Sequence, residues 1–183
     1  MTVREAPLPG VLIFEPKIFG DHRGFFVETY NEERYREAGL DVKFVQDNLS
    51  KSERGVLRGL HFQWPDPQGK LVSVLEGLVW DVAVDIRLGS PNFGEWHAEF
   101  LDGESKRQMW VPPGFAHGFV TLSDVAVFHY KCTSIYRAEY DFGVSFKDPD
   151  LGIPWPDLEL KLSAKDQNLP NLAYLPKDKQ PIY

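Results

Sequence analysis

Histidine is the side chain best suited to proton transfer near neutral pH, and the chain contains five: His22, His61, His97, His117 and His129. A metal-binding double-sheet fold usually supplies an H-x-H pair on one strand, with a carboxylate shortly after it. Here no two histidines stand two residues apart and there is no C-x-x-C pair, so a zinc or iron site has little support. We predict no metal site, although ligands converging from distant strands would leave no such signature.

His61 lies in the strand-like run LRGLHFQ (57–63), three residues after Arg58. A guanidinium in an apolar run is costly to bury without a partner, and an anionic ligand is one way to supply that partner. Strict alternation would place Arg58 and His61 on opposite faces, so both line one pocket only if Gly59 forms a β-bulge. Spacing alone still favours a simpler interpretation, a half-buried histidine hydrogen-bonded to a neighbour.

Four other polar side chains each have an ordinary structural explanation. Tyr130, in the run VFHYKCT, fits a core tyrosine whose hydroxyl is satisfied. Lys70 fits a solvated charge at the start of a strand, and His117 fits a histidine between a turn and a strand. Asp166 fits a carboxylate in the first turn of a helix. None of these residues identifies a site by itself.

Short runs of alternating hydrophobicity, separated by turn sequences, indicate the elements that must position these side chains. We expect strands within residues 10–14, 25–30, 43–50, 56–63, 70–77, 80–86, 95–101, 107–112, 116–122 and 126–136. Two short helices are expected, one after Asn31 and one after Ser163, because both residues are good N-caps. Many strands without intervening helices exclude a parallel α/β fold and favour an antiparallel sandwich or barrel.

Length and charge narrow the class of protein. The 183 residues suit one domain, residues 1–183, with an extended surface tail from about Pro170. The 20 basic and 27 acidic residues give a net charge of −7, which argues against nucleic acid polymers and membrane surfaces as partners. The single cysteine, Cys132, excludes an intrachain disulfide, and no apolar run is long enough for a signal peptide or a membrane span. We therefore expect a cytoplasmic protein.

Several motifs, in order along most of the chain, together resemble the dTDP-4-dehydrorhamnose 3,5-epimerase family. They are FGDHRGFFVETY (19–30), FVQDNLSKS (44–52), GVLRGLHFQ (55–63), PQGKLV (67–72), WDVAVDIR (80–87), VPPGFAHGF (111–119), YKCT (130–133), GIPWP (152–156) and LSAKD (162–166). The resemblance implies an all-β, double-sheet antiparallel jelly roll of cupin type with a few short helices. It also implies a homodimer whose subunits exchange strands, a dTDP-sugar substrate and no cofactor.

The family's reaction inverts carbons 3 and 5 of a 4-keto sugar through an enolate. By resemblance, His61 is the base, Asp166 orients its ring, and Tyr130 donates a proton on the other face. Lys70 and His117 match ligand-contacting positions, with Lys70 placed near the enolate oxygen and Asp81 expected as a partner of Lys70 or Tyr130. The resemblance assigns dTDP binding to Arg23, Glu28, Gln46, Asp47, Asn48, Arg58 and Lys165.

Two positions depart from the family pattern. Ile135 replaces the first of two tyrosines that many members carry, and Asp141 stands where a ligand-contacting glutamate is common. Because such details can change the outcome, inversion of a single carbon in a related dTDP-4-keto-6-deoxyhexose is an alternative function. A metal-dependent cupin enzyme and a non-catalytic sugar-nucleotide-binding protein are further alternatives.

Overall fold

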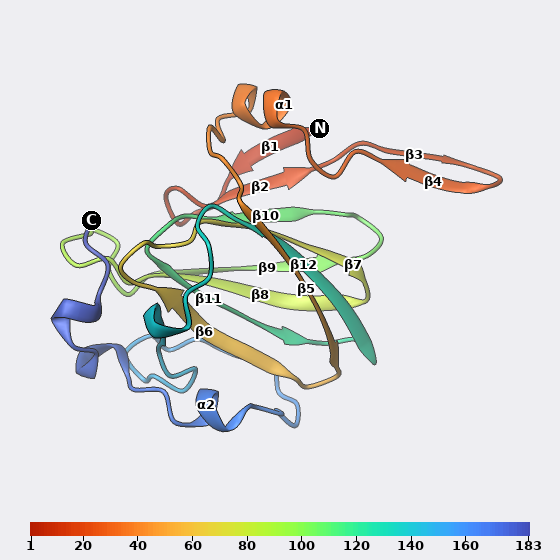
Figure 1. Ribbon diagram of the computed structural model, residues 1–183. Helices are drawn as coiled ribbons and strands as arrows, with labels where there is room; N and C mark the ends of the chain where they lie inside the picture. Colours follow the sequence, from red (N-terminus) through yellow and green to blue (C-terminus); the bar gives the residue numbers. More distant parts are fainter.

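Two antiparallel sheets that face one another form the body of the protein, and a long hairpin projects from it (Figure 1). The computed structural model describes all residues, 1–183. The strands are β1 (Thr2–Glu5), β2 (Leu12–Glu15), β3 (Ile18–Asp21), β4 (Gly24–Val27), β5 (Gln46–Glu53), β6 (Leu57–Gln63), β7 (Lys70–Glu76), β8 (Leu78–Asp85), β9 (Trp96–Asp102), β10 (Gln108–Val111), β11 (Phe115–Thr121), β12 (Val125–Cys132) and β13 (Asp141–Gly143). The helices are α1 (Glu32–Glu37) and α2 (Ala164–Gln167), with 3₁₀ turns η1 (Ala138–Tyr140), η2 (Leu172–Tyr174) and η3 (Lys177–Lys179).

The sheet order is that of a double-sheet jelly roll. One sheet has the order β1-β2-β10-β7-β12-β5, and the other has the order β13-β6-β11-β8-β9. All the strand pairs within these two sheets are antiparallel, so the predicted fold class is confirmed. Each strand predicted from the hydrophobic pattern is present, with bounds shifted by a few residues. The pattern missed β1, β3 and β13, which are three or four residues long.

The five-stranded sheet is buried on both of its faces, which explains the apolar character of β8. Val79 and Ala83 pack between the two sheets, while Trp80, Val82 and Val84 belong to a second cluster on the outer face. The C-terminal third of the chain covers that outer face with Val144, Phe146, Leu151, Ile153, Leu172 and Leu175. Asp81 and Asp85 alternate with Trp80, Val82 and Val84, and both are 0% exposed and require partners inside the protein.

Both helices begin where the sequence predicts. The Asn31 side chain accepts a hydrogen bond from the Arg34 N–H, and Ser163 Oγ accepts one from the Asp166 N–H. Helix α1 packs on the six-stranded sheet through Tyr35, which is 1% exposed and stacks on Phe14 with 4.8 Å between ring centroids. Helix α2 lies beside β6 and therefore packs next to the five-stranded sheet (Figure 1).

The last fourteen residues are anchored more firmly than a surface strap. Leu172, Leu175 and Gln180 are buried, and residue 182 forms a parallel bridge with Leu88. The Arg87 guanidinium lies between the rings of Phe115 and Tyr183, 4.6 and 4.7 Å from their centroids. Most residues of the predicted tail are exposed, but Leu172 and Leu175 pack against the outer face of the five-stranded sheet. No helix of the protein is long and apolar enough to cross a membrane.

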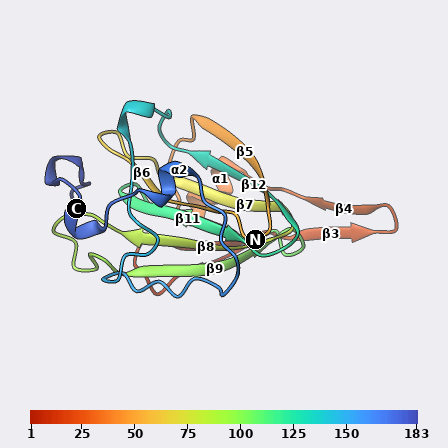
Figure 2. The same cartoon turned by 90° about the horizontal axis from the view of Figure 1, so that it is seen from below.

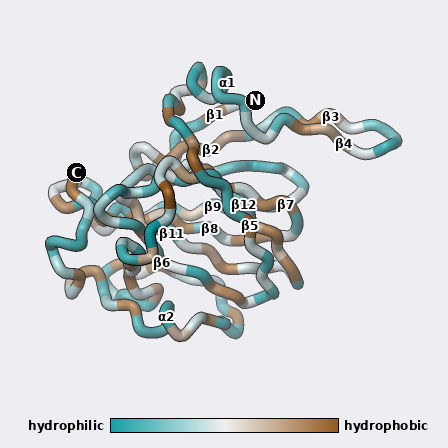
Figure 3. The backbone as a smooth tube through the Cα atoms, in the orientation of Figure 1, coloured by the Kyte–Doolittle hydropathy of each residue, from teal (hydrophilic) through white to brown (hydrophobic).

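The hairpin β3–β4 extends away from both sheets in the two views (Figures 1 and 2). It carries hydrophobic as well as hydrophilic residues, although the body of the protein does not cover it (Figure 3). Phe19, Phe25 and Phe26 are 53%, 61% and 68% exposed. Three exposed aromatic rings on one hairpin are typical of a surface that another protein chain covers.

Candidate active site

A cavity of about 420 Å³ opens between the two sheets, beside β5 and β6. Both sheets and helix α2 contribute to its wall. The lining residues are Asn48, Leu49, Ser50, Arg58, His61, Lys70, His117, Phe119, Phe128, Tyr130, Asp141, Ser163, Lys165 and Asp166. Nine of the thirteen residues assigned to the site by resemblance are therefore brought together in one place.

His61 and Asp166 form a close pair although 105 residues separate them in the sequence. His61 Nε2 lies 2.6 Å from Asp166 Oδ1, with the histidine side chain 30% exposed and the carboxylate only 4% exposed. Burial acts to raise the pKa of Asp166, but hydrogen bonds from His61, Ser163 and the Gly59 backbone outweigh it and hold that pKa below its ordinary value. A carboxylate ionised at neutral pH accepts the Nε2 proton, which leaves Nδ1 as the basic nitrogen.

A β-bulge places Arg58 and His61 on the same cavity, as the sequence required. His61 pairs with His117 and Arg58 pairs with Phe119, so Gly59 and Leu60 together oppose the single residue Gly118. Arg58 is exposed and donates from Nε to Ser52 Oγ at 3.0 Å. The guanidinium is therefore not buried, and Arg58 lines the cavity from an exposed position.

The bulge depends on two glycines in close contact. Gly59 has φ +121°, a conformation that L side chains rarely adopt. A Cβ atom on Gly59 would lie 2.6 Å from Gly118 Cα and 2.7 Å from the His117 carbonyl oxygen. Both of these atoms belong to the backbone of β11 and cannot move aside without displacing that strand.

Tyr130 and Lys70 enter the cavity from the six-stranded sheet, facing His61 on the other sheet. Burial raises the pKa of Tyr130 to about 12, so its hydroxyl is protonated at neutral pH and able to donate. Burial lowers the pKa of Lys70, which makes its ammonium a stronger acid than an exposed lysine. Lys70 Nζ lies 5.9 Å from the centre of the Tyr130 ring.

A second histidine–aspartate pair lies beside the first. His117 is 7% exposed, and its Nε2 lies 2.8 Å from Asp81 Oδ1. Asp81, on the strand next to β11, therefore hydrogen-bonds His117 and neither Lys70 nor Tyr130, although its charge also acts on Lys70 and opposes the lowering of the Lys70 pKa by burial. The second carboxylate oxygen, Oδ2, is buried without a hydrogen-bond partner.

Strand alternation separates the three polar residues at the start of β5. The Asn48 side chain lines the cavity, and Gln46 Nε2 donates to Asn48 Oδ1 at 3.0 Å. Asp47 points to the other face, where it accepts two hydrogen bonds of 2.9 Å from Lys131 Nζ. Gln46 thus lies next to the cavity without lining it, and Asp47 lies outside it.

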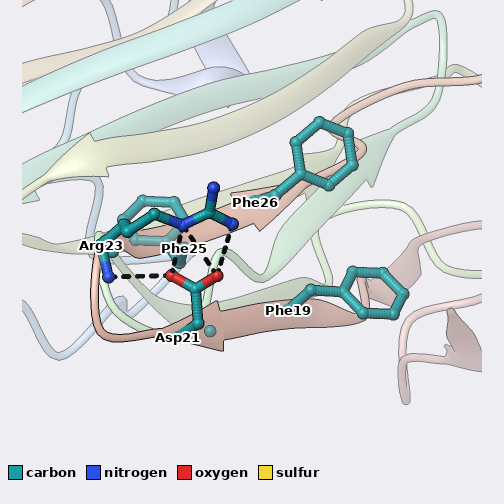
Figure 4. Close-up of a pocket in the computed structure, with 7 residues that line it drawn as sticks. Phe19, Asp21, Arg23, Phe25 and Phe26 are labelled. Atoms are coloured by element: carbon teal, nitrogen blue, oxygen red, sulfur yellow. Dashed lines mark hydrogen bonds and ion pairs between the residues drawn. The ribbon is translucent and has the colours of Figure 1, made fainter.

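Arg23 and Glu28 lie outside this chain's own cavity. Arg23 is at the tip of the projecting hairpin, where its side chain folds over Asp21 with an Nη2–Oδ2 distance of 2.6 Å (Figure 4). Glu28 accepts a hydrogen bond of 2.9 Å from Arg34 Nη1. Of the cations assigned to the ligand by resemblance, Arg58, Lys70 and Lys165 therefore line this chain's cavity, and Arg23 does not.

Some lining residues carried no signal in the sequence. Ser50, Phe119 and Phe128 are ordinary strand residues whose side chains only the sheet pairing turns inwards, and Leu49 borders the cavity although it is 64% exposed. Ser163 was foreseen as a helix cap but not as part of the wall. No group of three or more His, Cys, Asp or Glu side chains in the protein is arranged to hold a metal ion.

The fold and the cavity together define a class of protein: a cupin-like jelly-roll enzyme equipped for acid–base chemistry. A histidine oriented by a carboxylate faces a protonated tyrosine across the cavity, and a lysine lies beside that tyrosine.

Comparison with known proteins identifies the family. Residues 5–174 match the family described as dTDP-4-dehydrorhamnose 3,5-epimerase, and the chain belongs to that family. The enzyme of that name from Methanothermobacter thermautotrophicus is 51% identical over 180 residues, covering 96% of this chain and 94% of the relative. The predicted family and enzyme class are confirmed.

Solved structures agree with this assignment. The dTDP-6-deoxy-D-glucose-3,5-epimerase of Legionella pneumophila, in complex with dTDP-4-keto-L-rhamnose, superimposes with a TM-score of 0.97 at 50% identity, covering 100% of this chain and 98% of the other. A 3′-monoepimerase from Streptomyces bikiniensis, in complex with dTDP-quinovose, gives a TM-score of 0.87 at 39% identity. The match covers 92% of this chain and 86% of the other. The fold is thus shared by enzymes that differ in the number of carbons they invert.

Proposed function

We propose that this protein epimerises dTDP-4-dehydro-6-deoxy-D-glucose at carbons 3 and 5 to give dTDP-4-dehydro-L-rhamnose. The observation that carries the proposal is the 2.6 Å contact between His61 and Asp166 in a cavity that Tyr130 enters from the facing sheet. Inversion at carbon requires a base on one face of the sugar and an acid on the other, and two facing sheets supply that arrangement.

The residues divide the proton transfers among themselves. His61 removes the hydrogen next to the keto group, and the Asp166 carboxylate stabilises the imidazolium that forms. Lys70 donates to the enolate oxygen, where a buried ammonium with a lowered pKa lowers the barrier most. Tyr130 returns a proton on the opposite face, because its pKa of about 12 keeps the hydroxyl protonated. His117, held by Asp81, contacts the sugar beside them.

The nucleotide half of the substrate needs cations at the rim. Arg58 and Lys165 of this chain bind the diphosphate, and Asn48 and Gln46 contact the nucleotide. Arg23 and Glu28 reach a cavity only across a subunit boundary, so the proposal includes a homodimer in which the partner subunit's hairpin completes the site. The exposed phenylalanines of the hairpin support this assembly.

The remaining expectations are part of the same proposal. The enzyme acts without a metal or organic cofactor, in the cytoplasm, and on a small nucleotide sugar and not on a nucleic acid polymer or a membrane. The net charge of −7 supports the exclusion of nucleic acids and membranes, since both carry negative charge and would repel the protein.

Isotope exchange tests the reaction directly. The purified protein is incubated with dTDP-4-keto-6-deoxyglucose in heavy water with a chelator, and carbons 3 and 5 are followed by proton NMR. Deuterium at both carbons is the expected result. Deuterium at one carbon would identify a single-carbon epimerase, and no exchange despite dTDP binding would identify a non-catalytic binding protein. Exchange that appears only after metal is restored would refute the cofactor-free mechanism.

A further inference from the structure

Three segments meet at one carboxylate oxygen on the rim of the cavity. Asp141 Oδ2, on β13, accepts a hydrogen bond of 2.6 Å from Lys165 Nζ on α2. The same oxygen accepts one of 2.9 Å from the Tyr136 hydroxyl, in the loop after β12. We call these three residues, Asp141, Lys165 and Tyr136, the clasp.

The clasp lies where the substrate must enter. Lys165 lines the large cavity, and Tyr136 lines a smaller neighbouring cavity of about 180 Å³. Asp141 lines both, together with His61, Lys70 and Tyr130. A ligand that reaches the catalytic pair therefore passes next to the Asp141 carboxylate.

The charges of the clasp oppose the binding of an anion. Of the two cations on this side of the cavity, Arg58 has only Ser52 as a side-chain partner, whereas Lys165 is already paired with Asp141. A diphosphate that takes Lys165 must first displace a carboxylate, and it then lies close to a like charge. The Lys165 side chain is 45% exposed, so this exchange needs no rearrangement of the fold.

We propose that Asp141 is an internal competitor for the diphosphate: it holds Lys165 in the empty enzyme, weakens nucleotide binding and so favours release of the product. This inference rests on the proposed function, which supplies the diphosphate. It reverses the role expected from resemblance, where a carboxylate at this position contacts the ligand and its loss weakens binding. The two roles therefore predict opposite changes in the Kd for dTDP when Asp141 is replaced.

The test measures the Kd for dTDP by isothermal titration calorimetry. Asp141→Asn keeps the shape of the side chain but removes its charge, and we expect the Kd to fall about fivefold because one ammonium is freed and one like charge is lost. The difference is expected to shrink at high ionic strength, since the exposed charges are screened. Glu139→Gln is the matched control, because it removes the same charge two residues away from a side chain with no hydrogen-bond partner. We expect less than about a twofold change for it.

A double-mutant cycle shows whether the gain passes through Lys165. In a Lys165→Met background, Asp141→Asn is expected to improve the Kd by less than about twofold. An equal gain in that background would overturn the clasp, as would weaker or unchanged binding in Asp141→Asn alone, or a wild-type protein that does not bind dTDP. The proposed function is tested separately, by isotope exchange in the wild-type enzyme. If no exchange occurs, the proposed function fails, but the comparison of the Kd values for dTDP still tests the clasp.

Discussion

Replacing Gly59 by alanine tests the link between the backbone of β6 and the catalytic cavity. The residue has φ +121°, and its missing Cβ would meet two backbone atoms of β11 at 2.6 and 2.7 Å. The unfavourable φ costs about 1–2 kcal/mol. The clash adds about 1–3 kcal/mol, as overpacking usually does. We therefore expect Gly59→Ala to destabilise the protein by about 2–5 kcal/mol, or to lower the Tm by about 10 °C for a chain of this length.

The substitution should also abolish the arrangement of the site. If β6 relaxes to regular alternation, Arg58 and His61 turn to opposite faces of the sheet and one of them leaves the cavity. We expect kcat/KM to fall by about 100-fold or more at a temperature where the variant is folded, because a misplaced base loses most of its contribution. Circular dichroism melts and the isotope-exchange assay measure the two effects.

Gly89→Ala is the matched control, because Gly89 also has a positive φ of +85° but nothing lies within 4 Å of its missing Cβ. It should lose about 1–2 kcal/mol and retain full activity. If Gly59→Ala were no less stable than Gly89→Ala and exchanged protons at the wild-type rate, the argument that close contact with Gly118 creates the bulge would be refuted.

Four further substitutions test the site, the assembly and the stability. His61→Ala should reduce exchange at carbons 3 and 5 by about 1000-fold while the Kd for dTDP changes little, and normal turnover would remove His61 as the base. Tyr130→Phe should still exchange hydrogen for deuterium on the face of His61 but yield about 100-fold less inverted product in the NMR assay; normal inversion would assign the acid elsewhere. In a homodimer that shares sites, mixing inactive Arg23→Ala and His61→Ala subunits after dissociation should restore about a quarter of the wild-type activity, whereas no recovery would place both residues in one chain's site. Asp85 is held by Arg87 and Ser90 with a pKa below its ordinary value against the opposing effect of burial, so its stabilisation is fully present above about pH 4 and is lost as the pH falls through the folded-state pKa. Asp85→Asn should therefore lower the free energy of unfolding by about 3 kcal/mol at pH 7, and urea titrations should show the gap from wild type narrowing towards pH 2.

The proposed clasp and the proposed dimer act on the same half of the substrate. The partner subunit's Arg23 would add a third cation to the rim, beside Arg58 and Lys165. Asp141 acts in the opposite direction, because its charge offsets that of Lys165. On this proposal a single chain has a weak anion site, and assembly into the dimer would strengthen it. Binding of dTDP should accordingly be weaker for a monomeric variant, whatever the state of Asp141.

The sequence by itself determined the local structure. Alternating hydrophobicity indicated the long strands, the polar residues Asn31 and Ser163 marked both helix starts, and the single requirement that Arg58 and His61 share a pocket predicted the bulge at Gly59. These features depend on neighbours within a few residues, which the sequence displays directly. The order of motifs also indicated the family, because many short matches at coherent spacing occur together.

The tertiary structure decided which distant residues meet. Packing of α2 against β6 brings Asp166 to His61, and pairing of β8 with β11 brings Asp81 to His117; both contacts depend on the whole fold. Because side chains alternate along the edge strand β5, Asp47 points away from the cavity. The projecting hairpin holds Arg23 away from the cavity of its own chain. The C-terminal segment buries the outer face of the five-stranded sheet, whereas Asp81 lies on the inner face with Val79 and Ala83 and is buried between the two sheets. A residue's type gives the chemistry that it is able to do, but its partner, its burial and hence its pKa are set by contacts between segments far apart in the chain.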